Sequence, residues 1–266
     1  VHAQRNGTLQ VDNDPVRRHR HEVGCAAPVG EWLVTGTQKG EVFVWDSDGE
    51  LVFSRAVGRG GITALAGLEG EGFVLGDEGG QVWRLDHTTG WKAVLVDLLP
   101  APVTALVSAG GGRVVAGCRD GTLTPFAGRA ERFRTGRGRV QALAVEGRWA
   151  VAGHSDGAVT LLDLDGGRHQ MVRSNGDPVT AVTAIGGNLM VCGYGSGELA
   201  VVEAGGNREP RRVCDSPHGD SPHIGPVTVL AKCGPYVASA GADGGVIIWR
   251  VRDFAGQNPP HPDGEY

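Results

Sequence analysis

Lysine, methionine and long apolar runs are all scarce in this sequence. Lysine occurs only at positions 39, 92 and 232, so arginine carries nearly all of the positive charge, and the formal net charge is −5. This balance argues against a nucleic-acid partner. No apolar run reaches the roughly 18 residues of a membrane-spanning helix, and no signal-peptide pattern opens the chain. We therefore expect no membrane contact and a cytoplasmic location, and the bias toward Arg, Gly and Ala suggests a bacterial source.

Neither the cysteine spacing nor any common catalytic motif indicates an enzymatic or metal-binding site. Five cysteines stand at positions 25, 118, 192, 214 and 233, without a C-x-x-C pair, so neither a disulfide framework nor a zinc site is expected. Walker, G-x-S-x-G and H-E-x-x-H patterns are also missing. The stretch "DSPHGDSPHI" (215–224) holds two histidines and two aspartates. We interpret it as a duplicated surface loop, and we expect no metal, no cofactor and no catalytic residue.

Glycine is abundant, at 45 of 266 residues, and a glycine-centred turn recurs about every 40 residues. The turn glycines stand at positions 7, 40, 80, 121, 157, 197 and 244. In five repeats a strand of V-x-A-L type precedes the turn, in five an apolar run ending in small residues precedes it, and an alternating strand follows the turn. One repeat is therefore four short antiparallel strands. Because such a unit cannot bury both faces alone, stacking around an axis predicts an all-β fold, a β-propeller of four-stranded antiparallel blades.

The repeat also predicts the domain organisation. We expect a propeller over residues 1–253, with six complete blades and a remnant of a seventh at residues 1–22, and a flexible tail at 254–266. The remnant has no sequence for its innermost strand. Either the chain is a portion of a longer protein, or the ring closes on six blades. We favour the first alternative, in which other domains of the parent chain are possible partners.

The first and last complete repeats resemble the WD-repeat family. The resemblance rests on "VTGTQKGEVFVWD", which contains Trp45-Asp46, on "VASAGADGGVIIWR", and on the histidine-led "PHIGPVTVL". It implies that His223, Asp243, Ser239 and Trp249 hydrogen-bond in series within the last blade. A buried indole N–H needs an acceptor, and each further member needs its own partner. His223 is therefore expected to be structural.

A second resemblance is local. The segment "LDHTTGWKAV" is similar to the D-x-x-T-G turn of quinoprotein-type propeller repeats, with Asp86 and Gly90 closing a hairpin between the third and outer strands. It occurs convincingly once, so we favour a plain turn.

Propellers that resemble this chain mostly present loops to partner proteins, so we expect a non-catalytic protein–protein interaction scaffold or sensor module that binds a protein or peptide. The loops on the expected partner-binding face supply Lys39, Arg59, Arg119, Arg137, Arg139, His154, Tyr194 and His218. The alternative is a quinoprotein-like enzyme or cofactor-binding protein that uses the central funnel. The inner strands "ITAL", "VTAL", "VQAL", "VTAV" and "VTVL" offer threonines and Gln141 but no carboxylate or imidazole, which disfavours it.

Overall fold

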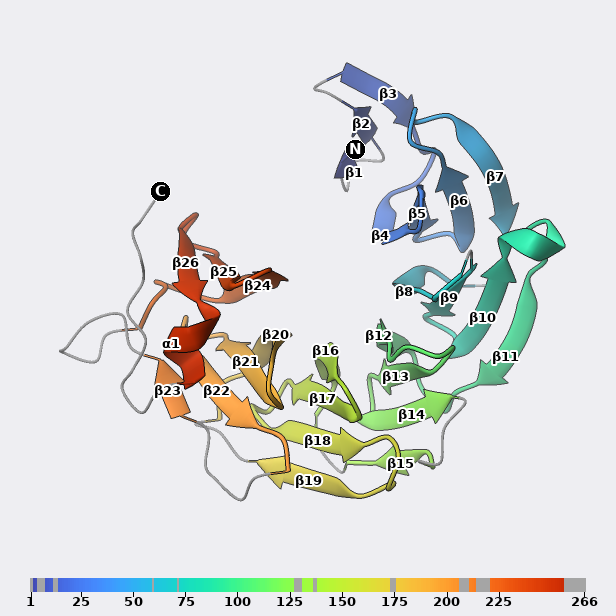
Figure 1. The fold of residues 1–266 in the computed structure, drawn as a ribbon. Coiled ribbons are helices and arrows are strands. Elements are labelled where there is room, and N and C mark those ends of the chain that lie inside the picture. The colour runs from blue at the N-terminus through green and yellow to red at the C-terminus, as the bar shows by residue number, and fades with distance from the viewer. Residues whose placement is uncertain are drawn as a thin grey trace. The chain divides into compact units, whose positions relative to one another are not determined.

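The computed structural model describes residues 2–3, 8–11, 14–58, 60–70, 72–126, 131–135, 138–172, 176–205, 211–213 and 221–255. The chain divides into two compact units, Val1–Ala127 and Gly128–Tyr266. Short β-strands that pair with their sequence neighbours build both units (Figure 1). The expected all-β fold of antiparallel sheets is confirmed.

The first unit begins with a three-stranded sheet, in the place of the expected remnant, and continues with two four-stranded sheets and three further strands. Its strands are β1 (His2–Ala3), β2 (Thr8–Val11), β3 (Asp14–Arg18), β4 (Val23–Val29), β5 (Trp32–Thr37), β6 (Glu41–Trp45), β7 (Leu51–Ala56), β8 (Ile62–Gly67), β9 (Gly72–Asp77), β10 (Gln81–Asp86), β11 (Val94–Leu98), β12 (Val103–Ser108), β13 (Val114–Cys118) and β14 (Thr122–Phe126). A short 3-10 helix, η1 (His87–Thr89), joins β10 to β11.

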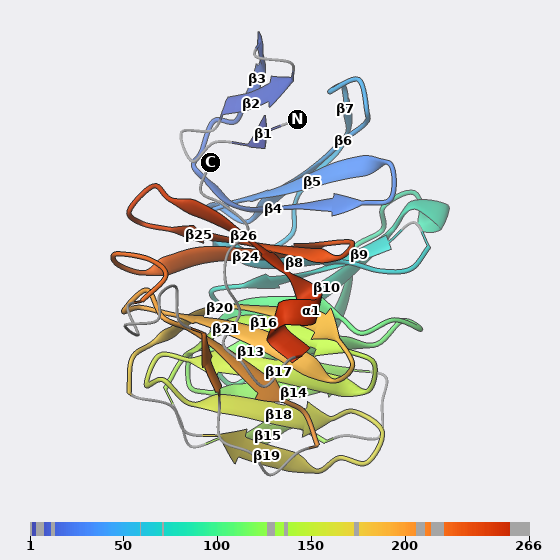
Figure 2. The ribbon, with the colours of Figure 1, turned by 60° about the vertical axis from the view of Figure 1, so that its left-hand side comes forward.

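The second unit contains two four-stranded sheets and ends in a three-stranded one. Its strands are β15 (Phe133–Arg134), β16 (Val140–Glu146), β17 (Trp149–His154), β18 (Val159–Asp163), β19 (His169–Val172), β20 (Val179–Gly186), β21 (Leu189–Tyr194), β22 (Leu199–Glu203), β23 (Arg211–Val213), β24 (Val227–Cys233), β25 (Tyr236–Gly241) and β26 (Val246–Arg250). The helix α1 (Val251–Ala255) follows β26 directly (Figure 2).

Helix α1 changes the expected boundary of the tail. We expected flexible chain from residue 254, but Phe254 is buried against Trp249, with ring centroids 6.0 Å apart. Burial of the apolar Phe254 ring stabilises the helix, because an extended chain would leave this ring in solvent. Residues 256–266 lie outside the described part of the chain.

The glycine turns between the second and third strands recur as the sequence indicates. At Gly157 the backbone N–H donates to the His154 carbonyl at 3.1 Å, and at Gly244 the N–H donates to the Gly241 carbonyl at 3.2 Å. The φ angles of Gly157 and Gly244, 83° and 82°, lie in the left-handed region that glycine enters without a steric penalty. Gly7 lies outside the described residues.

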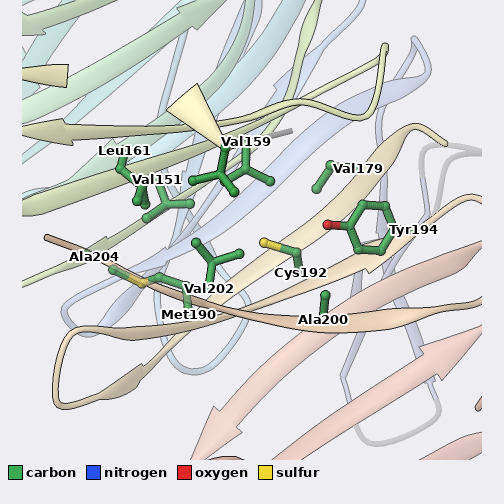
Figure 3. Close-up of a cluster of buried hydrophobic side chains, with 11 residues drawn as sticks. Val151, Val159, Leu161, Val179, Met190, Cys192, Tyr194, Ala200, Val202 and Ala204 are labelled. Atoms are coloured by element: carbon green, nitrogen blue, oxygen red, sulfur yellow. The ribbon is translucent and has the colours of Figure 1, made fainter. Parts of the chain in front are cut away.

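Within each unit the sheets stack face to face. In β21, Met190 points into a cluster that also contains Val151 and Val202 (Figure 3), whereas the next residue, Val191, packs with Val237 of the following sheet. Because successive side chains of a strand point to opposite faces, the sheet β20-β21-β22-β23 is covered on both sides. The core of the unit is thus a series of apolar layers between sheets.

Candidate functional site

The structure brings the four residues of the expected hydrogen-bond series together at the last sheet. The Trp249 indole N–H donates to Ser239 Oγ at 2.9 Å, and this hydroxyl lies 2.8 Å from His223 Nε2. On the other side of the ring, Nδ1 lies 3.4 Å from Asp243 Oδ1. Hydrogen bonds therefore link the indole, the hydroxyl and the imidazole, whereas the carboxylate lies at ion-pair distance from Nδ1 without a hydrogen bond to it.

These contacts hold a loop in place. Asp243 accepts the backbone N–H of Gly245 at 2.9 Å and that of Ile224 at 2.8 Å. These two hydrogen bonds, in this order, lower the pKa of Asp243, and His223 lowers it further. Because His223 and Ser239 are buried, the series ties the segment before β24 to the turn between β25 and β26. We therefore assign it a structural role.

A second series of this kind was missed from the sequence. In the sheet β4-β5-β6-β7, the Trp45 indole N–H donates to Thr35 Oγ1 at 3.0 Å, and Thr35 Oγ1 lies 3.2 Å from His19 Nε2. Burial lowers the pKa of His19, and the charge of Glu41 opposes this effect. Lys39 stands directly before the turn glycine, where Asp243 stands in the last repeat, so the series ends at the histidine.

Two residues of the expected partner-binding face are buried, which corrects our interpretation of them. His154 is 0% exposed, with Nδ1 donating to the Gly138 carbonyl at 3.0 Å and Nε2 lying 2.9 Å from Thr160 Oγ1. Tyr194 is 2% exposed and belongs to the apolar cluster of Figure 3. Both residues end the second strand of their sheets, just before the turn.

The same strand-end position has a common role in two other sheets. Thr37 Oγ1 accepts the N–H groups of Lys39 and Glu41, and Asp77 Oδ1 accepts those of Gly79 and Gln81. A side chain at this position turns back under the hairpin. This is the physical reason why His154 and Tyr194 do not face solvent.

The remaining residues of the expected face divide into two groups. Lys39, Arg119 and Arg139 are exposed, and Lys39 and Arg119 lie in the turns between second and third strands. Arg59, Arg137 and His218 lie outside the described part of the chain.

The polar groups of the inner strands are used in backbone contacts. Thr63 Oγ1 lies 3.1 Å from the Gly76 carbonyl of its own sheet and 2.6 Å from the Val103 carbonyl of the next. Thr180 makes the same pair of contacts in the second unit. The Gln141 amide, in its hydrogen-bonded orientation, donates to the Val179 carbonyl at 3.1 Å. These side chains hold neighbouring sheets together, which leaves the described inner strands little for binding a cofactor.

The segment that resembles quinoprotein repeats forms a capped turn. Asp86 Oδ1 accepts the backbone N–H of Thr88 at 3.0 Å and its hydroxyl at 2.6 Å. Gly90 ends η1 in the left-handed conformation, and its N–H donates to the His87 carbonyl. The expected hairpin between the third and outer strands is therefore present in this sheet.

The described residues also bear on metal binding and on membrane insertion. In the described part of the chain, no three His, Cys, Asp or Glu side chains lie close enough together to hold a metal ion. None of the described helices has the length and apolar character to cross a membrane.

The stacked four-stranded antiparallel sheets define a β-propeller. A family model named PQQ_2 and described as outer membrane protein assembly factor BamB matches residues 1–137. The chain belongs to this family, which is not the WD-repeat family that its motifs resemble. No curated protein matches the chain significantly.

Two solved structures support the fold. The chain is similar to the computationally designed Ika8 protein, with a TM-score of 0.79 and 26% identity over 98% of this chain and 81% of Ika8. It is also similar to a chain of the mitotic checkpoint complex, with a TM-score of 0.73 and 16% identity over 86% of this chain and 74% of that one. The second likeness concerns the fold alone.

Proposed function

We propose that the chain is a non-catalytic protein-binding propeller that contacts its partner through the turns between second and third strands. The observation that carries the proposal is a uniform turn backbone. In the six turns at glycines 40, 80, 121, 157, 197 and 244, the glycine N–H donates to the carbonyl three residues earlier, at 3.1 or 3.2 Å. Exposed side chains on a rigid repeated frame are typical of binding surfaces.

The side chains presented by these turns differ from sheet to sheet. Exposed residues of the turns include Lys39, Glu78, Arg119, Asp156 and Ser196. Such variation favours recognition of a partner surface over a repeated ligand. The description of the matching family as an assembly factor for proteins supports the same role.

A photo-crosslinking amino acid at position 39 or 119 tests the proposal. The matched control position is Lys92, which is exposed in the same unit but lies at the other end of the strands, before β11. We expect positions 39 and 119 to yield one crosslinked protein in the native host, identified by mass spectrometry, and position 92 to yield none. Equal yields at all three positions would remove these turns from consideration. The cytoplasmic location stays a prediction and is tested in the same cells by fractionation.

The resemblance to WD repeats is limited to the internal contacts of two sheets. From indole to hydroxyl to imidazole, the Trp249 and Trp45 series follow the hydrogen-bond order that the resemblance implies. We propose that these two sheets share the internal contacts of that repeat, within a chain of the PQQ_2 family.

A quinoprotein-like cofactor binder is the second candidate, favoured by the PQQ_2 match and by the turn at Asp86. The described inner strands do not fit such a group, because Thr63, Thr180 and Gln141 face backbone carbonyls. We therefore expect no saturable change in tryptophan fluorescence when pyrroloquinoline quinone is titrated. Stoichiometric binding would favour the cofactor role.

A further inference from the structure

A pocket of about 560 Å³ lies in the second unit at the end of β26. Its lining combines three cations, Lys232, Arg250 and Arg252, with Tyr236, Ile185 and Val251, and it contains no acidic side chain. The whole chain carries a formal net charge of −5. The pocket lining is therefore positively charged, although the chain as a whole is negatively charged.

Both strand cations also depart from the repeat. Arg250 follows the last large apolar residue of the third strand, where four other repeats have an acid: Asp46, Asp86, Asp163 and Glu203. Lys232 occupies an inner-strand position that is uncharged in the other sheets: Pro28, Gly67, Ser108, Val145 and Ala184. The last sheet has thus changed charge at two places that meet in one pocket.

Two of the acids in the other repeats accept hydrogen bonds from backbone N–H groups of the next turn. Asp46 Oδ1 accepts the N–H groups of Asp48 and Glu50, and Asp163 Oδ1 accepts those of Asp165 and Gly166. These bonds close the hairpin that leads to a fourth strand. In the last sheet α1 follows β26 at once, so Arg250 has no such hairpin to close.

Two contacts show where parts of the pocket lining lie. The Lys232 ammonium lies 3.9 Å from the place that a Cβ on Gly186 would occupy, so it reaches the turn between β20 and β21. It has no ion pair or hydrogen bond among the described residues. In addition, the Val251 N–H donates to the Pro235 carbonyl at 2.7 Å and fixes the start of α1, which carries Arg252.

The last sheet also has an edge strand, β26, beside this pocket. Among the described strands, β26 pairs only with β25, whereas β18 and β22 each also pair with a fourth strand. A third strand with an open edge offers backbone N–H and C=O groups for pairing. The cationic pocket lies at the carboxyl end of this edge.

We propose that the β26 edge and the cationic pocket bind an extended acidic peptide segment of a partner protein, which pairs as the fourth strand of the last sheet. In the other sheets the fourth strand is antiparallel and starts beside the end of the third, as His169 does beside Leu162. The acidic side chains therefore belong at the amino-terminal end of the peptide, next to Arg250. Arginine and lysine recognise carboxylates by charge-assisted hydrogen bonds. This inference rests on the protein-binding role proposed above.

Fluorescence anisotropy of the full chain with labelled peptides tests the proposal. The probe is the peptide EEVTVTVTGS, compared with QQVTVTVTGS and with an EEVTVTVTGS peptide that is N-methylated at alternate residues. We expect each change to weaken binding by about tenfold or more. Equal binding of the glutamine peptide would overturn the role of the pocket, and equal binding of the methylated peptide would overturn strand pairing.

Variants of the protein locate the contact. Lys232→Glu/Arg252→Glu should weaken binding of EEVTVTVTGS by at least about tenfold, whereas Arg168→Glu, an exposed cation of the same unit, should change it less than about twofold. Circular dichroism melts check that each variant is folded, and the peptide comparison on the unaltered chain decides the matter if a variant is not. Binding of inorganic phosphate without binding of the acidic peptide would contradict the proposal, because the pocket would then recognise an anion and not a peptide strand. Crosslinks at positions 39 and 119 with no peptide binding would leave the protein-binding role standing without it.

Discussion

Replacing Gly193 of β21 with alanine should destabilise the second unit. A Cβ at this position would lie 2.6 Å from Val227 Cγ1 and 2.7 Å from Val227 Cβ, in the inner strand of the following sheet. Carbon atoms in good contact lie about 3.5–4.0 Å apart, so the two sheets would have to separate by about 1 Å. Gly36 meets Ile62 in the same way in the first unit, with a closest approach of 2.7 Å.

The magnitude follows from two opposing effects. Forcing an extra carbon into a packed interior costs about 1–3 kcal/mol, and the smaller freedom of alanine in the unfolded chain returns about 0.4–1 kcal/mol. We therefore expect Gly193→Ala to lower the free energy of unfolding by about 1–2 kcal/mol. Urea melts followed by tryptophan fluorescence measure this, since Trp149 and Trp249 belong to the same unit.

The matched control is Ala240, which takes the place of Gly193 in the last sheet. Among the described residues of this unit, no further sheet follows to pack over it, so Ala240→Val should change the free energy of unfolding by less than about 0.5 kcal/mol. Val227→Ala removes the methyl groups in conflict, so the double variant with Gly193→Ala should lose less than the sum of the single losses. Unaltered stability of Gly193→Ala, or strict additivity with Val227→Ala, would falsify the close-packing argument.

Three further outcomes are expected. Trp249→Phe removes the indole N–H from Ser239 and should cost about 1 kcal/mol, and Trp249→Ala about 3–5 kcal/mol; unchanged urea midpoints would contradict the burial of this ring. Burial raises the pKa of Asp77 above its ordinary value of 3.8, so the stability from its protonated form is complete below pH 3.8 and is lost as the pH rises through the raised pKa. Asp77→Asn should therefore gain about 1 kcal/mol over the unaltered chain at pH 7 and lose this advantage in acid; a loss at pH 7 would show that the charge is used. Cys233 is exposed, whereas Cys192 is buried with a pKa raised to about 12 by burial, so peptide mapping after alkylation should find Cys233 modified in the native chain and Cys192 only after unfolding; similar rates would contradict the packing of β21.

The blades could be predicted from the sequence because their turns have chemical signatures. A glycine after Asp or Lys, with an alternating strand behind it, needs no tertiary information to be recognised. The end of the last repeat was harder, because Arg250 continues an ordinary strand pattern and only the packing of Phe254 on Trp249 shows that a helix follows.

The candidate site could be predicted only where spacing carries the information. His223 precedes Ser239 by 16 residues and His19 precedes Thr35 by the same number, so the second series was within reach of the sequence. His154 was misplaced for a different reason. The repeat locates it at a turn, but the direction of its side chain depends on Gly138 and Thr160, which the repeat does not encode.

The last sheet shows how differences between repeats of one chain reveal which surfaces are covered. Gly193 lacks a side chain where Val227 packs, and Ala240 has one where no sheet follows in the described part of this unit. The Thr180 hydroxyl donates to the carbonyl of Val227 in the next sheet, whereas the Thr228 hydroxyl donates to the Ala240 carbonyl of its own sheet. Val246, on the same face, is 43% exposed, while Leu199 at the equivalent place in β22 is 0% exposed. These differences all occur at positions where a following sheet would make contact, so they mark a face of β24-β25-β26 that no described sheet of this unit covers. Beside this face, Arg250 replaces the acid of four other repeats and Lys232 replaces an uncharged residue.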